Sequence, residues 1–201
     1  MKTLKESNEN EMILEFLKGE YNSNRFNEKL TNILNKLKVK PEIILNGKLN
    51  NEENTIRKEI MSNYRGYPNK ELFNNFPFIN SWKLVKFNQE DINNIYYIDY
   101  DYWNLLSNNT SKPLEAAKTI NKGIEIYNVS NKPFLDGVNT LKENTFPPII
   151  LITCNEEKYL IIEGHSRMTI YGLEPSYFEN TLGFIGYCSK EDMEKYDKRM
   201  L

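Results

Sequence analysis

The spacing of apolar residues predicts helices in the first third of the chain. Over residues 24–38 the apolar side chains recur every three to four positions, which is the spacing of one helix face. An earlier helix is predicted over residues 9–18, ended by Gly19, and a third over residues 53–64. The sequence therefore predicts an N-terminal α-helical extension over residues 1–68.

Shorter runs rich in β-branched and aromatic residues predict strands later in the chain. Residues 82–87 alternate between apolar and polar, and residues 95–98 form a second short run. Residues 149–153 are continuously apolar, which is typical of a strand buried on both faces. Residues 159–162 follow after a turn and predict the hairpin partner of that strand. The fold expected for residues 69–201 is an α/β (α+β) domain with a small mixed sheet.

Two further helices are predicted among these strands. One begins at Pro113, a residue favoured at the first helical position, and is closed by Gly123. The other covers residues 133–143. Together with the strands, these helices make the region after residue 68 the place to look for a binding site.

Composition limits the classes of function. The 201 residues include 26 basic and 28 acidic side chains, so the net charge of −2 lacks the positive field expected of a domain that holds nucleic acid by its backbone. The two cysteines are too few for a disulfide scaffold or a cysteine-rich zinc site. The start of the chain has no apolar leader segment, and no apolar run approaches the ~20 residues that span a bilayer. We therefore expect a cytoplasmic protein.

The polar loop at residues 163–167, EGHSR, carries the clearest chemistry. It follows a predicted buried strand and leads into a predicted helix, so its backbone N–H groups and the helix dipole favour an anion. Gly164 allows close approach of a ligand. His165, Ser166 and Arg167 add an imidazole, a hydroxyl and a guanidinium that can hold phosphate oxygens. These residues predict a phosphate site.

A purely structural interpretation of the EGHSR loop stays open beside this one. Ser166 could cap the helix, and Arg167 could pair with a neighbouring carboxylate. His165 is the only histidine of the chain and lies among polar residues directly after a buried strand. On the pattern alone, a ligand-binding role and a capping role have about equal weight.

The run PPIILITCNEEKYLIIEGHSRMTIYGL, residues 147–173, resembles the core of the ParB/sulfiredoxin-like superfamily. The signature of that superfamily is a hydrophobic strand, a turn, a second hydrophobic strand, a D/E-G-x-x-R loop and a helix. The loop and helix start bind CTP in ParB partition proteins, ATP in sulfiredoxins and ADP in a free-serine kinase, whose D-G-H-T-R loop is closely similar to EGHSR. The resemblance extends more loosely over residues 82–187. Together with the YIDYDYW segment at residues 97–103, it is similar to a set of uncharacterised bacterial members.

Departures from the superfamily pattern argue against the sulfiredoxin activity and against the ParB partition function. Sulfiredoxins need a cysteine directly before the histidine, and this chain has Gly164 there. Cys154 and Cys188 are expected to be small buried hydrophobes and not nucleophiles. About thirty residues follow the core, so we expect no helix-turn-helix domain of the ParB type after it.

The resemblance implies roles for the loop residues in phosphoryl transfer or nucleotide hydrolysis. Glu163 is implied as a base or as a Mg²⁺ ligand, and His165 as a donor to the transferred group. Thr169 lies one turn further along the predicted helix and is included in the phosphate site. Asp99 and Asp101 are candidates for a second carboxylate, and Lys112 and Lys118 for secondary phosphate contacts. The two aspartates have a structural alternative, the capping of the helix that follows them.

Three functions follow from these observations. The first is a nucleotide-binding ParB/sulfiredoxin-like protein, with ATP, ADP or CTP as ligand, that transfers or hydrolyses phosphate. The second is a non-catalytic module that uses the same pocket as a ligand switch and contacts a protein partner through its N-terminal helices. The third is a DNA-binding or nuclease-like protein, against which the acidic balance argues. The oligomeric state cannot be predicted from the pattern.

Overall fold

A six-stranded mixed sheet forms the centre of the part of the chain described by the computed structural model, residues 1–23 and 25–201. The strands are β1 (Lys2–Ser7), β2 (Ile79–Lys86), β3 (Ile95–Tyr96), β4 (Ile149–Thr153), β5 (Tyr159–Glu163) and β6 (Leu182–Cys188). Their order in the sheet is β1-β2-β6-β4-β5-β3. Strand β4 pairs with β5 antiparallel and with β6 parallel, and β3 pairs with β5 parallel. The expected α/β class with a mixed sheet is confirmed.

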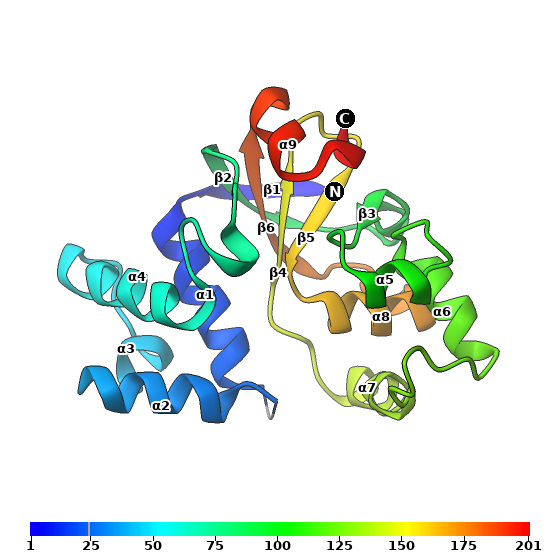
Figure 1. The fold of residues 1–201 in the computed structure, drawn as a ribbon, viewed down its shortest axis with the longest axis horizontal. Helices are drawn as coiled ribbons and strands as arrows, with labels where there is room; N and C mark the ends of the chain where they lie inside the picture. Colours follow the sequence, from blue (N-terminus) through cyan, green and yellow to red (C-terminus); the bar gives the residue numbers. More distant parts are fainter. Residues whose placement is uncertain (24) are drawn as a thin grey trace.

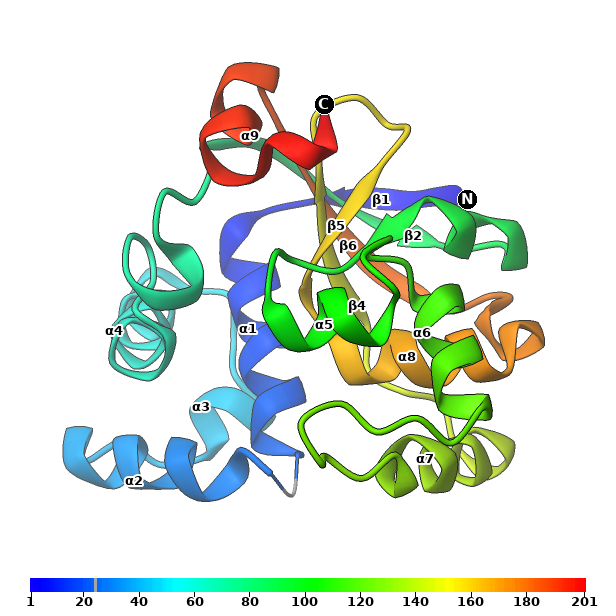
Figure 2. The same ribbon diagram turned by 45° about the vertical axis from the view of Figure 1, so that its right-hand side comes forward.

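Helices cover both faces of this sheet, as Figures 1 and 2 show. One face carries α1 (Glu9–Tyr21), α2 (Asn27–Leu37), α3 (Glu42–Leu45), α4 (Asn51–Arg65), the 3₁₀ turn η1 (Glu71–Phe73) and α9 (Lys190–Asp197). The other carries α5 (Asp101–Leu106), α6 (Pro113–Asn121), α7 (Lys132–Glu143) and α8 (His165–Leu173). Further 3₁₀ turns are η2 (Gln89–Asn94), η3 (Pro175–Phe178) and η4 (Lys198–Met200). The molecule is thus a helix–sheet–helix sandwich.

The alternation of side chains along the central strands divides the core into two clusters. On β4, Ile150 and Ile152 pack against the N-terminal helices, whereas Ile149 and Leu151 pack against α6 and α8. All five residues of β4 are buried. The prediction that residues 149–153 form a strand buried on both faces is confirmed, because a sheet covered by helices on two sides needs apolar residues at every position.

The N-terminal region is continuous with this core. Residues 2–7, for which no strand is predicted, form β1 and pair with β2 at the edge of the sheet. The predicted helix over residues 24–38 begins at a residue outside the described part; the observed helix α2 starts at Asn27. Helix α1 continues through Gly19, where the prediction ends it. The division at residue 68 stays an interpretation of the sequence, but the two parts it separates share one core.

The elements around the aromatic segment differ in detail from expectation. Helix α6 begins at Pro113 as predicted. Helix α5 begins at Asp101, and its N-cap residue Tyr100 makes no side-chain cap bond, so the two aspartates do not cap it through hydrogen bonds. No helix of the described residues is long and apolar enough to cross a membrane.

Candidate functional site

The loop between β5 and α8 exposes an uncapped helix N-terminus. Gly164 is the N-cap residue, with a φ of 105°, a backbone conformation that glycine adopts without strain. No side chain accepts a hydrogen bond at this cap, and no acidic residue lies in the first turn of α8. The predicted capping role of Ser166 is therefore wrong: its side chain is exposed, two residues past the N-cap. The first N–H groups of α8 remain available to an anion.

Neighbouring protein groups hold the guanidinium of Arg167. Its Nη1 donates to the carbonyl oxygens of Pro147 (2.5 Å) and Pro148 (2.9 Å), and its Nη2 donates to Glu163 Oε1 (2.6 Å). A Cβ added at Gly19 of α1 would lie 3.5 Å from Nη2, so α1 packs directly over the guanidinium. The structure thus shows Arg167 paired with a carboxylate, the structural alternative left open above.

His165 begins α8 and packs against two aromatic rings. Its ring centroid lies 5.6 Å from that of Trp103 and 6.1 Å from that of Tyr97, with interplanar angles of 18° and 14°. The Nε2 atom is buried and finds no hydrogen-bond partner among the described residues. Burial, together with the nearby Arg65 and Arg167, lowers the pKa of His165 to about 3. The imidazole is therefore neutral at physiological pH and offers a hydrogen bond instead of a charge.

Glu163 ends β5 and is already engaged. Its Oε1 accepts from Arg167, and both side chains are about 15% exposed. Burial raises the pKa of the Glu163 carboxyl; Arg167 opposes the rise and the nearby carboxylate of Glu20 adds to it. A general base at this position would have to give up its pairing with Arg167 first.

The other predicted residues lie apart from the loop or inside the core. Thr169 is fully buried; its Oγ1 donates to the His165 carbonyl (2.9 Å) and shares a hydrogen bond with the Tyr97 hydroxyl (2.7 Å). Lys118 pairs with Glu115 on the exposed face of α6. Neither residue is placed to reach a ligand at the α8 N-terminus.

The remaining secondary candidates contact residues of their own neighbourhood. Asp99 accepts from Asn104 Nδ2 at 2.7 Å and lies 3.8 Å from Arg199 Nη1. Lys112 lies over the ring of Tyr96, 5.2 Å from its centroid. Asp101 is exposed in the first turn of α5. The structure does not bring these residues together with the EGHSR loop.

The two cysteines are consistent with the expected inert role. Cys188 is buried and Cys154 is partly exposed, and both are free thiols. Burial raises the pKa of the Cys154 thiol and raises that of Cys188 to about 12. Both shifts disfavour the thiolate that a nucleophile requires.

A group of residues from the N-terminal helices, not predicted from the sequence, lies next to the loop. Glu20 at the end of α1 accepts from Arg65 Nη2 (2.5 Å) and from the Tyr64 hydroxyl, both at the end of α4. Gly19, the residue before Glu20, packs against the Arg167 guanidinium, which places this group beside the loop. The charge of Arg65 accordingly acts on the pKa values of Glu163 and His165. No spacing signal connects residues 20 and 65 with residue 163, because only the packing of α1 and α4 against the sheet brings them together.

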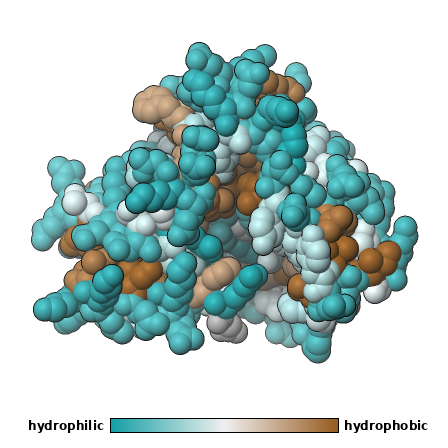
Figure 3. All heavy atoms as spheres, viewed as in Figure 1, coloured by the Kyte–Doolittle hydropathy of each residue, from teal (hydrophilic) through white to brown (hydrophobic). Residues whose placement is uncertain are grey.

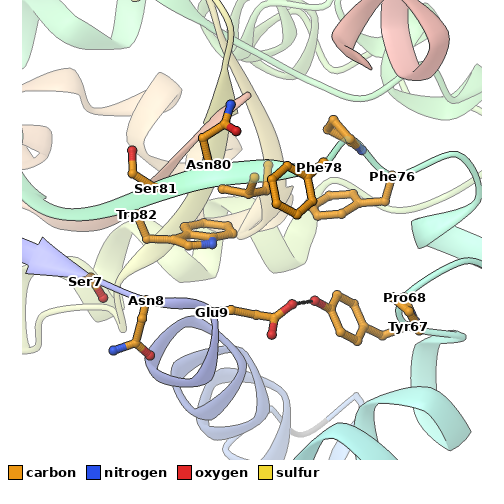
Figure 4. Close-up of a pocket in the computed structure, with 12 residues that line it drawn as sticks. Ser7, Asn8, Glu9, Tyr67, Pro68, Phe76, Phe78, Asn80, Ser81 and Trp82 are labelled. Carbon is orange, nitrogen blue, oxygen red and sulfur yellow. Dashed lines mark hydrogen bonds between the residues drawn. The ribbon is translucent and has the colours of Figure 1, made fainter. Parts of the chain in front are cut away.

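Two clefts lie elsewhere on the molecule. The larger, of about 480 Å³, lies at the start of β2; Figure 4 shows Trp82 and Phe78 on one side and Glu9, bonded to Tyr67, on the other. The second, of about 380 Å³, lies over Leu160 of β5, and its lining includes the acidic residues Glu71, Asp99 and Asp197. Figure 3 shows the surface hollowed between the N-terminal helices and α5, with apolar residues in the hollow. Neither cleft lining contains a lysine or arginine within the described residues, so neither favours an anion.

The carboxylates near the loop do not fit a protein-bound Mg²⁺. Magnesium requires several oxygen ligands in octahedral geometry. Glu163 accepts from Arg167, and Glu20 accepts from Arg65 and Tyr64, so both carboxylates already have donors. No group of three or more histidine, cysteine, aspartate or glutamate side chains suited to a metal occurs in the described part of the chain. These carboxylate oxygens therefore accept hydrogen bonds from neighbouring side chains and are not free to coordinate a metal ion.

Comparisons of the chain with protein-family models, with curated proteins and with solved structures found no significant match. The resemblance of residues 147–173 to the ParB/sulfiredoxin-like superfamily stays a prediction from the sequence.

Proposed function

We propose that this protein binds a phosphate-bearing ligand, a nucleotide, at the N-terminus of α8. The observation that carries the proposal is the uncapped first turn of α8 next to the buried, unpartnered Nε2 of His165. A buried polar atom without a partner costs free energy, and a ligand oxygen at this position would satisfy it. The resemblance to the ParB/sulfiredoxin-like superfamily supports the same ligand class, because its members bind nucleotides at this loop.

Binding without phosphoryl transfer is the better supported activity. Transfer needs a base near the acceptor and neutralisation of the phosphate charge. Glu163 is paired with Arg167, and His165, with a pKa of about 3, is not an imidazolium near neutral pH and so is a poor general acid. We therefore favour the non-catalytic role, in which the ligand acts as a switch.

A substitution at Ser166 tests the site without disturbing the core. Ser166 is exposed, and an aspartate there would place a carboxylate in the first turn of α8, where it stabilises the helix and repels an anion. We expect Ser166→Asp to lower nucleotide affinity at least tenfold and Ser166→Ala to lower it less than threefold. Calorimetry with ATP, ADP, CTP, GTP and inorganic phosphate, each with and without Mg²⁺, measures both.

Two outcomes would contradict the proposal. Absence of binding by the wild type would remove the nucleotide ligand, and unchanged affinity in Ser166→Asp would move the ligand away from α8. Release of phosphate from a nucleotide by the wild type, at a rate that Glu163→Gln reduces, would replace the switch by an enzyme.

A further inference from the structure

Cations from α2, from α4 and from the segment between α1 and α2 gather around two aromatic rings. The guanidinium carbons of Arg25 and Arg65 lie 4.9 Å and 4.8 Å from the centroid of the Phe26 ring. Lys29 Nζ lies 5.0 Å from the centroid of the Tyr64 ring and donates to the Tyr64 carbonyl. Arg25, Arg65 and Lys29 thus pack against the rings of two aromatic residues, Phe26 and Tyr64.

Among the described residues, the ion pairs of these cations involve a single carboxylate. Glu20, 2% exposed, is paired with Arg65. The ion pairs of the described residues include none for Arg25 or Lys29, and Arg25 is exposed. Within the described residues, Arg25 and Lys29 therefore carry positive charges that no ion pair neutralises.

Three of the buried side-chain atoms without hydrogen-bond partners belong to elements beside the EGHSR loop. They are Arg65 Nε, the Tyr102 hydroxyl and His165 Nε2, from α4, α5 and α8. Gly19 of α1 packs against the Arg167 guanidinium, and the next residue, Glu20, is paired with Arg65, so α4 is linked to the start of α8 through α1. The effect of the Arg65 charge on the pKa of His165 agrees with this arrangement. Trp103 contacts both the Tyr102 ring and the His165 ring. Unpartnered atoms on neighbouring elements indicate a shared ligand.

We propose that Arg25 and Arg65 complete the phosphate site of α8, and that the ligand carries two or more phosphate groups and bridges α8 and the N-terminal helices. This inference rests on the proposed function. The α8 N-terminus holds one phosphate, and the guanidinium groups hold the next, since arginine binds phosphate oxygens through paired N–H donors. They supply the cationic contact that Arg167 cannot, because its guanidinium is turned to Glu163 and two carbonyl groups.

Calorimetry with tripolyphosphate and with inorganic phosphate, at low ionic strength, tests the inference. The wild type is expected to bind tripolyphosphate at least tenfold more tightly than inorganic phosphate. Arg25→Gln is expected to lower the affinity for tripolyphosphate about tenfold, which is the usual effect of one charge-assisted contact. The matched control is Lys36→Gln, which removes one exposed positive charge from the last turn of α2. We expect it to change the affinity less than twofold.

Arg65 needs a conservative substitution, because its loss would leave the buried Glu20 unpaired. Arg65→Lys keeps the charge and removes the planar pair of donors, and we expect a threefold to tenfold loss of tripolyphosphate affinity with an unchanged circular dichroism spectrum.

The outcomes separate this inference from the proposed function. Wild-type affinity in both Arg25→Gln and Arg65→Lys, with loss of binding in Ser166→Asp, would overturn the bridging site and leave the α8 site standing. An equal loss in Arg25→Gln and Lys36→Gln would also overturn it, because general charge attraction would then explain the effect. Absence of any phosphate binding by the wild type would overturn both.

Discussion

At the scale of single residues, the environment of each side chain decides what its chemistry is used for. Arg167 and His165 are neighbours in the EGHSR loop and are both predicted to contact phosphate. The structure commits the donors of Arg167 to Glu163 and to two carbonyl groups, whereas His165 keeps an unpartnered Nε2. Burial and hydrogen bonding, which the sequence does not display, separate their roles.

Replacement of Arg167 should therefore destabilise the protein. Arg167→Ala leaves Glu163 and two carbonyl groups without donors in a site about 15% exposed, and we expect a loss of about 3 kcal/mol in the free energy of unfolding. Lys118→Ala removes an exposed ion pair with Glu115 and should cost less than about 0.5 kcal/mol. Urea denaturation measures both. Similar losses in the two variants would show that the Arg167 contacts add little to stability.

His165 should make stability depend on pH. Its pKa is about 3 in the folded protein and about 6.5 in the unfolded chain, so the unfolded chain takes up the proton first as the pH falls below 6.5. The free energy of unfolding should then fall by about 2 kcal/mol between pH 7.5 and pH 5 on account of this residue. Denaturation of the wild type and of His165→Gln at the two pH values isolates the effect. An identical pH dependence in both proteins would contradict it.

At the scale of elements, the turn between β5 and α8 sets the direction of the helix N-terminus. Figure 1 shows α8 starting at the end of β5 next to α1. The positive φ of Gly164 makes the turn, and its position against Ile149 leaves no room for a side chain, since a Cβ would lie 2.8 Å from Ile149 Cγ2. The glycine thus serves both the backbone turn and the packing of β4.

A comparison of Gly164 with Gly123 separates the effect of the backbone conformation from the effect of packing. Gly123 also has a positive φ, of 72°, but no atom lies within 4 Å of a Cβ built there. We expect Gly123→Ala to cost about 1 kcal/mol from the backbone alone, and Gly164→Ala to cost at least about 1 kcal/mol more from the contact with Ile149. Thermal denaturation followed by circular dichroism provides the comparison. Equal losses of stability in the two variants would mean that the structure around Gly164 accommodates the added methyl group without strain.

At the scale of the whole molecule, the N-terminal helices form one of the two layers that cover the sheet. They bury one face of the central strands, including Ile150, Ile152, Leu160, Ile162 and Phe184. Burial of such a side chain stabilises by about 2 kcal/mol, so this face contributes an amount comparable with the entire stability of a typical domain. Helix α4 also carries Arg65, one of the two arginines of the proposed phosphate site.

A fragment comprising residues 69–201 should therefore not fold alone. Without α1 and α4 the apolar face of the sheet would be open to water, and we expect a poorly dispersed amide spectrum and binding of a hydrophobic dye. The full chain should unfold in a single transition. A well-dispersed spectrum of the fragment would show instead that residue 68 is a true domain boundary.

The sequence by itself determined several of the central elements and the position of the loop. The apolar run at residues 149–153 and its hairpin partner are local patterns, and Pro113 marks a helix start through its own ring, so each is predictable from neighbouring residues. The order strand, loop, helix around Gly164 follows for the same reason.

Only the tertiary structure decided which residues meet at the loop. Residues 2–7 become a strand only because β2 offers them an edge, and their own pattern is too polar to predict it. Glu20 and Arg65 reach the EGHSR loop through the packing of α1 and α4, and Arg167 is withdrawn from the surface by carbonyl groups twenty residues earlier in the chain. Such contacts depend on how separate elements pack, and no spacing along the chain encodes them.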